Sequence, residues 1–260
     1  MRLCGLRLRL RLRRRRSVSD ADASRPSERL QRAQAEWLAP ARARLLRQAQ
    51  IARRRRVLDL GCGAGAVLPE LVRRAGGCVI ALDIDRRSVM MAAAAAPAAA
   101  PLIGDGTWLP LRDASLDLIF CQLVFVWMDA EAAASEAARV LAPGGVLCAL
   151  EPDYGGMIEH PPAIAARDVW VAAIARAGGD PLMGRRLRGV LAAAGFLVKP
   201  QLLPDLAPPD RARFELLRGL PLTNAERELV DAAAAAEAAL PRDAWRVAHL
   251  PVVSVLATKA

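Results

Sequence analysis

Three carboxylates in the chain each follow an apolar stretch, at the point where a buried strand would end. Asp59 lies within VLDLGCGAG, Asp83 closes CVIALD, and Asp105 stands between two glycines in PLIGDG. In an open parallel sheet, the carboxyl ends of neighbouring strands meet at one edge, where such sheets bind ligands. The pattern therefore predicts one polar ligand site that is formed by the ends of three strands.

Two glycines, Gly61 and Gly63, follow the first of these strands. They allow a ligand to approach the backbone, and the helix beyond them presents free N–H groups. Asp83 can accept two hydrogen bonds from a ribose diol, which indicates an adenosine-containing ligand. With Ala66 the glycines also match G-x-G-x-x-A, so a nicotinamide dinucleotide stays open. Asp59 would repel a pyrophosphate, however, and it suits a cationic ligand.

Strand-like and helix-like segments alternate from residue 57 onward, which predicts a mainly parallel sheet with helices on both faces. A helical segment precedes them, with Ser27 as its N-cap and a break or kink at Pro40. Its candidate inward positions are Leu30, Trp37, Leu38, Leu45 and Leu46. The predicted strands cover residues 57–60, 78–85, 101–106, 116–127, 146–152, 196–203 and 252–259.

Four segments, in this order, resemble motifs of the class I S-adenosylmethionine-dependent methyltransferases. VLDLGCGAG is similar to their first motif, ALDID to the ribose-binding strand end, GDGTWLPLRDASLDLIFCQLVF to the adenine loop and fourth strand, and RVLAPGG to the signature after it. The resemblance is to the small-molecule subgroup that includes the ubiquinone/menaquinone-biosynthesis type. It implies a doubly wound α/β fold, with a seven-stranded, mainly parallel, Rossmann-like sheet whose last strand is antiparallel.

The resemblance also implies a cofactor, S-adenosyl-L-methionine, and a set of residues that hold it. Asp83 would bind the ribose hydroxyls, Asp105 the adenine amine, and Asp59 and Gln122 would face the methionine end. Asp59 could instead cap the next helix, and Asp105 could be a turn residue. The assigned cofactor residues are Asp59, Gly61, Gly63, Asp83, Asp105, Gly106 and Gln122.

Methyl transfer from a sulfonium is an in-line displacement that depends mainly on alignment, so no particular catalytic residue is required. The polar side chains expected nearest the leaving methyl group are Glu151, Tyr154 and His160. We expect a small organic acceptor, covered by lid insertions near residues 151–183 and 205–245. The five cysteines have no metal-ligand spacing, so no metal site is predicted.

The net charge of +10 resides mostly in the first sixteen residues, which hold eight arginines and no acid. Without them the balance is 29 basic against 27 acidic residues, so the body of the chain disfavours nucleic acid as a partner. We expect residues 1–26 to be a disordered extension and linker, and residues 27–260 to form a single domain. No apolar run is long enough to span a membrane, and no secretory signal is recognisable, which predicts a cytoplasmic protein.

Three other functions remain open on the sequence. The glycine spacing permits an NAD(P)-dependent oxidoreductase, although no Tyr-x-x-x-Lys pair is recognisable. The fold could also bind its cofactor without catalysis, although the full set of carboxylates and glycines argues against a degenerate site. An arginine-rich arm that guides nucleic-acid methylation is the third. The residues indicate neither the acceptor nor the oligomeric state.

Overall fold

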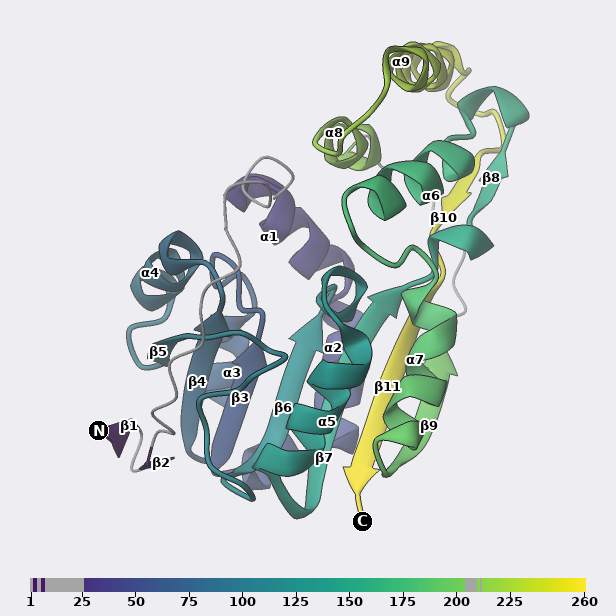
Figure 1. Cartoon of the computed structure of the whole chain (residues 1–260). Helices are drawn as coiled ribbons and strands as arrows, with labels where there is room; N and C mark the ends of the chain where they lie inside the picture. Colours follow the sequence, from purple (N-terminus) through teal and green to yellow (C-terminus); the bar gives the residue numbers. More distant parts are fainter. Residues whose placement is uncertain (1, 4–5, 8–25, 204–209, 211) are drawn as a thin grey trace.

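A computed structural model describes residues 2–3, 6–7, 26–203, 210 and 212–260. Most of the predicted extension lies outside the described residues. The centre of the molecule is one sheet of seven strands in the order β5-β4-β3-β6-β7-β11-β9 (Figure 1). The strands are β3 (Arg56–Leu60), β4 (Cys78–Asp83), β5 (Ala100–Ile103), β6 (Leu116–Gln122), β7 (Leu141–Pro152), β9 (Phe196–Leu202) and β11 (Val252–Lys259).

Strand β11 is antiparallel to both of its neighbours, β7 and β9, while the pairs among β3 to β7 are parallel. This confirms the predicted fold class, including the antiparallel last strand. The parallel strands carry their carboxyl ends to one edge of the sheet. Strands β4 and β5 lie on one side of β3, and strands β6 and β7 lie on the other. The switch point, where such sheets bind ligands, therefore lies beside the glycine turn that follows β3.

Helices cover both faces of the sheet because side chains on each buried strand alternate between two cores. Leu58 and Ile80 pack in one core with α5 (Ala130–Val140) and α7 (Met183–Ala193). Val57, Val79 and their neighbours pack in the other. The helices on that second face are α2 (Ala39–Gln48), α3 (Leu68–Arg74) and α4 (Arg86–Ala95).

Helix α1 (Glu28–Trp37) begins as predicted, with the Ser27 hydroxyl accepting the Leu30 N–H at 3.4 Å. It is followed directly by α2, which has Pro40 in its first turn, where a missing N–H is tolerated. Four of the predicted inward leucines are buried, but the prediction for Trp37 was wrong, since its side chain is 41% exposed. Leu38 is the buried residue at the junction, and Trp37 lies about 100° further around the helix.

Two segments after the fifth parallel strand stand above the carboxyl edge of the sheet (Figure 1). Strands β8 (Ile158–His160) and β10 (Val247–His249) pair antiparallel within them. The first segment also carries α6 (Arg167–Arg176), and the second carries α8 (Ala212–Arg218) and α9 (Asn224–Ala239). The helices and strands of these segments lie in and beside residues 151–183 and 205–245, for which lid insertions are predicted, and we call the two segments together the lid.

Arg213 joins the two parts of the lid. Its guanidinium is buried and forms ion pairs with Glu159 at 2.6 Å and with Glu237 at 2.7 Å. It also donates a hydrogen bond to the carbonyl of Ile164 at 2.8 Å. Glu159 in turn accepts the N–H groups of Ala166 and Arg167, where α6 begins. One arginine therefore connects α8 with β8, α9 and the segment that leads into α6.

Candidate functional site

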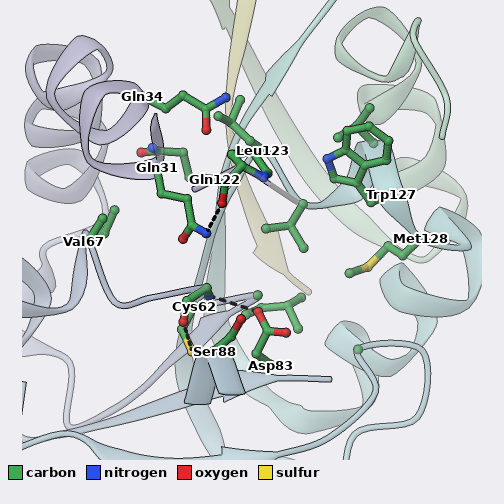
Figure 2. A pocket seen from close by; sticks show the side chains of 18 of the residues that line it. Gln31, Gln34, Cys62, Val67, Asp83, Ser88, Gln122, Leu123, Trp127 and Met128 are labelled. Carbon is green, nitrogen blue, oxygen red and sulfur yellow. Dashed lines mark hydrogen bonds between the residues drawn. The ribbon is translucent and has the colours of Figure 1, made fainter. Parts of the chain in front are cut away.

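A cavity of about 390 Å³ lies at the carboxyl edge of the sheet, between α1 and the lid (Figure 2). It is bordered by the ends of β3, β4 and β6 and by the loops that follow them. The residues that the sequence assigned to the cofactor come from different parts of the chain, yet they all line this one cavity. They are Asp59, Gly61, Gly63, Asp83, Asp105, Gly106 and Gln122.

The glycine turn after β3 has a left-handed backbone at Gly61 (φ +71°) and at Gly63 (φ +51°). A Cβ atom added to Gly61 would lie 2.6 Å from Cγ1 of Val124, and one added to Gly63 would lie 2.5 Å from Oε1 of Gln31. The left-handed conformation favours glycine at both positions, and the close contact with Val124 adds a steric reason at Gly61. The sequence analysis explained these glycines by the close approach of a ligand. The structure adds that the turn packs closely against the side chains of Val124 and Gln31.

Asp83 is buried at the end of β4, and both of its carboxylate oxygens accept backbone hydrogen bonds. Oδ2 accepts the Gly63 N–H at 3.0 Å, and Oδ1 accepts the Asp85 N–H at 2.9 Å. Asp85 caps α4 by accepting the Ser88 N–H, as expected from its position. The Asp83 carboxylate is therefore held in place beside the glycine turn, where each oxygen can accept a further hydrogen bond.

Asp59 is 3% exposed, and burial, with a smaller contribution from the nearby Asp83, raises its pKa to about 7. Arg42 acts in the opposite direction and favours the carboxylate. The alternative role of helix cap does not apply, since α3 begins after Val67 without any side-chain cap. A buried carboxyl group that is poised near neutrality responds strongly to a cationic ligand beside it.

Asp105 is a turn residue, which was one of the two roles that the sequence allowed, and one of its carboxylate oxygens stabilises the turn. Oδ1 accepts both the N–H and the hydroxyl of Thr107, at 2.8 and 2.7 Å. Gly106 beside it is buried, and a Cβ atom there would lie 3.0 Å from Cδ1 of Leu60. This turn sets the position of the loop after β5 at the cavity wall.

Gln122 is oriented by Arg42, a residue that sequence reasoning missed. The buried Arg42 guanidinium donates to Oε1 of Gln122 at 3.0 Å, to the Ala35 carbonyl at 2.8 Å and to Glu70 at 2.8 Å. Arg42 and Gln122 are eighty residues apart in the chain. The sequence offered no local signal for this contact, because arginine is abundant throughout.

Helix α1 also contributes side chains that the sequence did not indicate. Gln31 and Gln34 line the cavity, opposite the strand ends that carry the carboxylates (Figure 2). Oε1 of Gln31 accepts the Ala64 N–H at 2.9 Å, and its Nε2 donates to the Pro26 carbonyl at 2.9 Å. The helix is therefore attached to the glycine turn by a side chain, and it covers that end of the cavity.

Of the three predicted catalytic candidates, only Tyr154 lines the cavity. Its ring stacks on Trp170 at a centroid distance of 5.0 Å, and burial raises the pKa of its hydroxyl, which stays protonated at neutral pH. His160 lies in β8, where its ring faces Trp245 at 4.7 Å, and it is not among the residues of the cavity wall. The structure therefore does not bring His160 to the site.

Glu151 is fully buried behind the cavity wall and is engaged by the backbone. Its carboxylate accepts the N–H groups of Val124, Phe125 and Val126 at 2.8, 3.0 and 3.3 Å. Burial raises its pKa to about 7, and these hydrogen bonds oppose the shift. Glu151 thus fixes the turn after β6, which presents Val124 and Trp127 to the cavity.

The side of the cavity nearest the lid is apolar and aromatic. Figure 2 shows Trp127 and Met128 across the cavity from Val67 and Gln31. The other large side chains of this side come from lid helices and from the loop after β7. The set is Trp127, Met128, Tyr154, Trp170, Leu216 and Leu220, and we call it the acceptor half. The cofactor half consists of the seven residues assigned above.

Two further observations concern metals and membranes. Among the described residues, no group of three or more His, Cys, Asp or Glu side chains is placed to hold a metal ion. Within the same part of the chain, no helix combines the length and the apolar character that crossing a bilayer requires.

Comparisons with known proteins show similarity to methyltransferases over part of the chain. Residues 58–149 match the methyltransferase domain family. The fold is shared with the geranyl diphosphate C-methyltransferase of Streptomyces coelicolor, whose structure contains S-adenosyl-L-homocysteine. The TM-score is 0.56 at 17% identity, over 88% of this chain and 83% of that one. Residues 58–149 are therefore similar to a methyltransferase domain, as the motifs in this segment indicated, and they lie on a fold that a solved methyltransferase shares.

Two curated relatives agree with this assignment. An uncharacterized methyltransferase of Mycobacterium tuberculosis is 38% identical over 112 residues, which are 43% of this chain and 41% of the relative. The trans-aconitate 2-methyltransferase of Rhizobium leguminosarum is 36% identical over 119 residues, or 45% of this chain and 46% of the relative. The chain thus matches less than half the length of either relative.

Proposed function

We propose that this protein transfers a methyl group from S-adenosyl-L-methionine to a small organic acceptor. The observation that carries the proposal is the convergence of the cofactor half: residues from four strand ends, assigned from sequence motifs, border one cavity. The match of residues 58–149 to the methyltransferase domain family supports it.

The side chains of the cofactor half fit this cofactor. Asp83, with both oxygens directed by backbone N–H groups, would accept hydrogen bonds from the ribose hydroxyls. Asp105 would receive the adenine amine. Asp59 and Gln122 would face the cationic methionine end, where the Asp59 carboxylate would be kept ionised by the ligand's charge. Bound S-adenosylmethionine supplies an activated methyl group on its sulfonium.

The chain's own contribution to the reaction is alignment and the exclusion of water. Alignment of two reactants can lower a barrier by roughly 7–11 kcal/mol. The acceptor half would hold the second reactant against the sulfonium and keep bulk water out. No general base is assigned, because the Tyr154 hydroxyl stays protonated and the Glu151 carboxylate is engaged by three backbone N–H groups.

The oxidoreductase alternative receives no support. The charged side chains among the described residues of the cavity wall are Asp59, Asp83 and Asp105, which would repel a pyrophosphate. Both curated relatives reported above are methyltransferases. The acceptor in the name of the Rhizobium relative is not proposed as the acceptor of this protein, because the match covers 45% of this chain.

The proposal is tested by calorimetric titration of the protein with S-adenosylmethionine, S-adenosylhomocysteine and NADPH. We expect both adenosyl compounds to bind and NADPH not to bind, with and without residues 1–16. Binding of NADPH alone would overturn the proposal. If the protein without residues 1–16 no longer bound S-adenosylmethionine, the arginine-rich arm would have a role in the function.

Asp83→Ala provides the matching variant. We expect it to weaken S-adenosylmethionine binding at least about tenfold, because charge-assisted hydrogen bonds to the ribose are lost. Asp231→Ala removes an exposed carboxylate on α9 that pairs with Arg218, and it serves as the control with unchanged affinity. Equal affinities of the two variants would remove the ribose assignment of Asp83.

A further inference from the structure

The acceptor half of the cavity indicates what kind of molecule receives the methyl group. We propose that the acceptor is an electrically neutral, largely apolar molecule that carries a hydrogen-bond-accepting oxygen. This inference rests on the proposed function and deepens it, since it concerns the second substrate of the same site.

The first argument is charge. No lysine, arginine or histidine occurs among the described residues that line the cavity, although the chain has 37 basic residues. An anionic acceptor buried there would have no cationic side chain of the described wall as a partner, and a buried charge without a fixed partner in the protein is strongly unfavourable. The three carboxylates of the cofactor half would add repulsion. An acceptor with a free carboxylate or phosphate therefore does not suit this wall.

The second argument is that three arginines, one each on α6, α7 and α8, are already paired. Arg213 pairs with Glu159 and Glu237, Arg185 pairs with Asp153 at 2.7 Å, and Arg176 pairs with Glu226 at 2.8 Å. Each of these guanidinium groups already has a carboxylate partner within the protein. To serve an anionic substrate, it would have to leave that partner.

The third argument is shape and polarity. The acceptor half presents two indole rings, one phenol ring and three aliphatic side chains, a combination that favours a flat or extended apolar molecule. The phenol ring belongs to Tyr154, whose hydroxyl stays protonated. A protonated hydroxyl can donate a hydrogen bond, and the natural complement of that donor is an oxygen on the ligand.

The experiment uses the full chain saturated with S-adenosylhomocysteine and two matched pairs of probes, phenol with benzoate and 2-naphthol with 2-naphthoate. At neutral pH the first member of each pair is neutral and the second is an anion of similar size. Binding is measured by calorimetry. We expect the neutral member of at least one pair to bind about tenfold or more tightly than its anion.

Preference for the anions would overturn the inference, and so would no binding of any probe to protein that still binds S-adenosylhomocysteine. Failure to bind S-adenosylhomocysteine itself would instead overturn the proposed function, and the inference with it. The first titration therefore separates the two proposals before any probe is added.

Two variants test the charge and the hydrogen bond separately. Leu216→Lys places a cation at the wall and should shift the preference toward 2-naphthoate by about tenfold or more, while Leu229→Lys, on an exposed part of α9, should not. Tyr154→Phe keeps the aromatic ring but removes the hydroxyl, and it should weaken 2-naphthol binding about threefold or more. An unchanged preference in Leu216→Lys, with S-adenosylhomocysteine affinity intact, would contradict the inference.

Discussion

The two halves of the cavity are built from different kinds of sequence. The cofactor half comes from consecutive strand ends, and six of its seven residues fall between Asp59 and Gly106. The acceptor half is assembled from the turn after β6, the loop after β7, and helices α6 and α8, which come together only in the folded lid (Figure 1). A short motif therefore encodes the first half, whereas tertiary packing creates the second.

The contacts that hold each half follow the same division. In the cofactor half, Asp83 reaches Gly63 over twenty positions of the chain, within one strand–helix–strand unit. In the lid, Arg213 reaches Glu159 over fifty-four positions and Glu237 over twenty-four. If the halves are independent, a change in one should leave ligand binding by the other intact. The variants below test that independence, from the largest expected effect to the smallest.

Arg213→Ala should separate the halves most clearly. It leaves two buried glutamates without their cation, and breaking a buried ion pair costs about 3–5 kcal/mol. We expect this loss of stability in urea unfolding, with the affinity for S-adenosylhomocysteine nearly unchanged.

Arg218→Ala is the control for that variant, since Arg218 pairs with Asp231 on the surface. Exposed pairs contribute about 0–1 kcal/mol. Equal stabilities of the two variants would show that Arg213 does not hold the lid together. A large loss of cofactor affinity in Arg213→Ala would show that the halves are coupled.

Gly61→Ala should break the cofactor half alone. Gly144 has the same φ of +71°, but a Cβ atom there would meet nothing within 4 Å. We expect both alanine variants to lose about 1 kcal/mol of stability from the left-handed backbone. Gly61→Ala must also displace Val124, so it alone should lose S-adenosylmethionine affinity, by about tenfold or more. Equal affinities in calorimetry would mean that the close approach at Gly61 is unimportant for binding.

The pH dependence of S-adenosylmethionine binding should report on Asp59. With a pKa of about 7, roughly nine in ten molecules carry a neutral Asp59 at about pH 6, and the cationic ligand needs the carboxylate. The affinity should therefore rise about tenfold between pH 6 and pH 8. The Asp59→Asn variant should bind weakly and lose the part of this dependence that Asp59 causes. A wild-type profile with the same slope as the variant's would contradict the assignment.

The same shift has an opposite consequence for stability. Because the folded pKa is raised above the ordinary value of 3.8, the stability that Asp59 contributes is present below about pH 4 and is lost as the pH rises through about 7. Asp59→Asn should therefore raise the melting temperature at pH 8 and have little effect at pH 4. A lower melting temperature at pH 8 would mean that the Asp59 carboxylate stabilises the free protein.

The smallest effect is expected for Tyr154→Phe. Since burial raises the pKa of Tyr154, the hydroxyl is a donor and not a base, and its loss should change the rate of methyl transfer less than about tenfold. The rate with a neutral acceptor, measured by S-adenosylhomocysteine release, checks this. A loss of a hundredfold or more would restore Tyr154 as a catalytic residue.

The sequence predicted a mainly parallel sheet, and it predicted that the residues of the cofactor half lie together, because both features depend on local patterns. The antiparallel last strand was implied by the resemblance to a known family. Alternating apolar strands and a glycine turn next to carboxylates are readable over a few residues. Gln31 and Arg42 could not be predicted, since their contacts with Ala64 and Gln122 span thirty-three and eighty positions. The position of Trp127 in the cavity wall likewise depends on a distant residue, because Glu151 of β7 accepts the N–H groups of the turn after β6.

The catalytic candidates show the same limit. His160 was chosen because it follows the fifth parallel strand closely, but β8 pairs with β10 and directs the ring toward Trp245. That pairing joins segments almost ninety positions apart, which no local pattern indicates. Asp105, by contrast, forms the turn that its immediate neighbours suggested.

The buried arginine of the lid also constrains how this protein can be recombined with its relatives. Since Arg213 comes from the second insertion and Glu159 from the first, a chimera that exchanges only the second insertion would leave the Glu159 carboxylate buried without its cation. The two insertions therefore form one transplantable unit, despite the helix and strand that separate them in the chain. We expect the substrate specificity of such chimeras to be that of the protein that supplies both insertions. The sheet and its glycine turn would be the part that the exchanged proteins have in common.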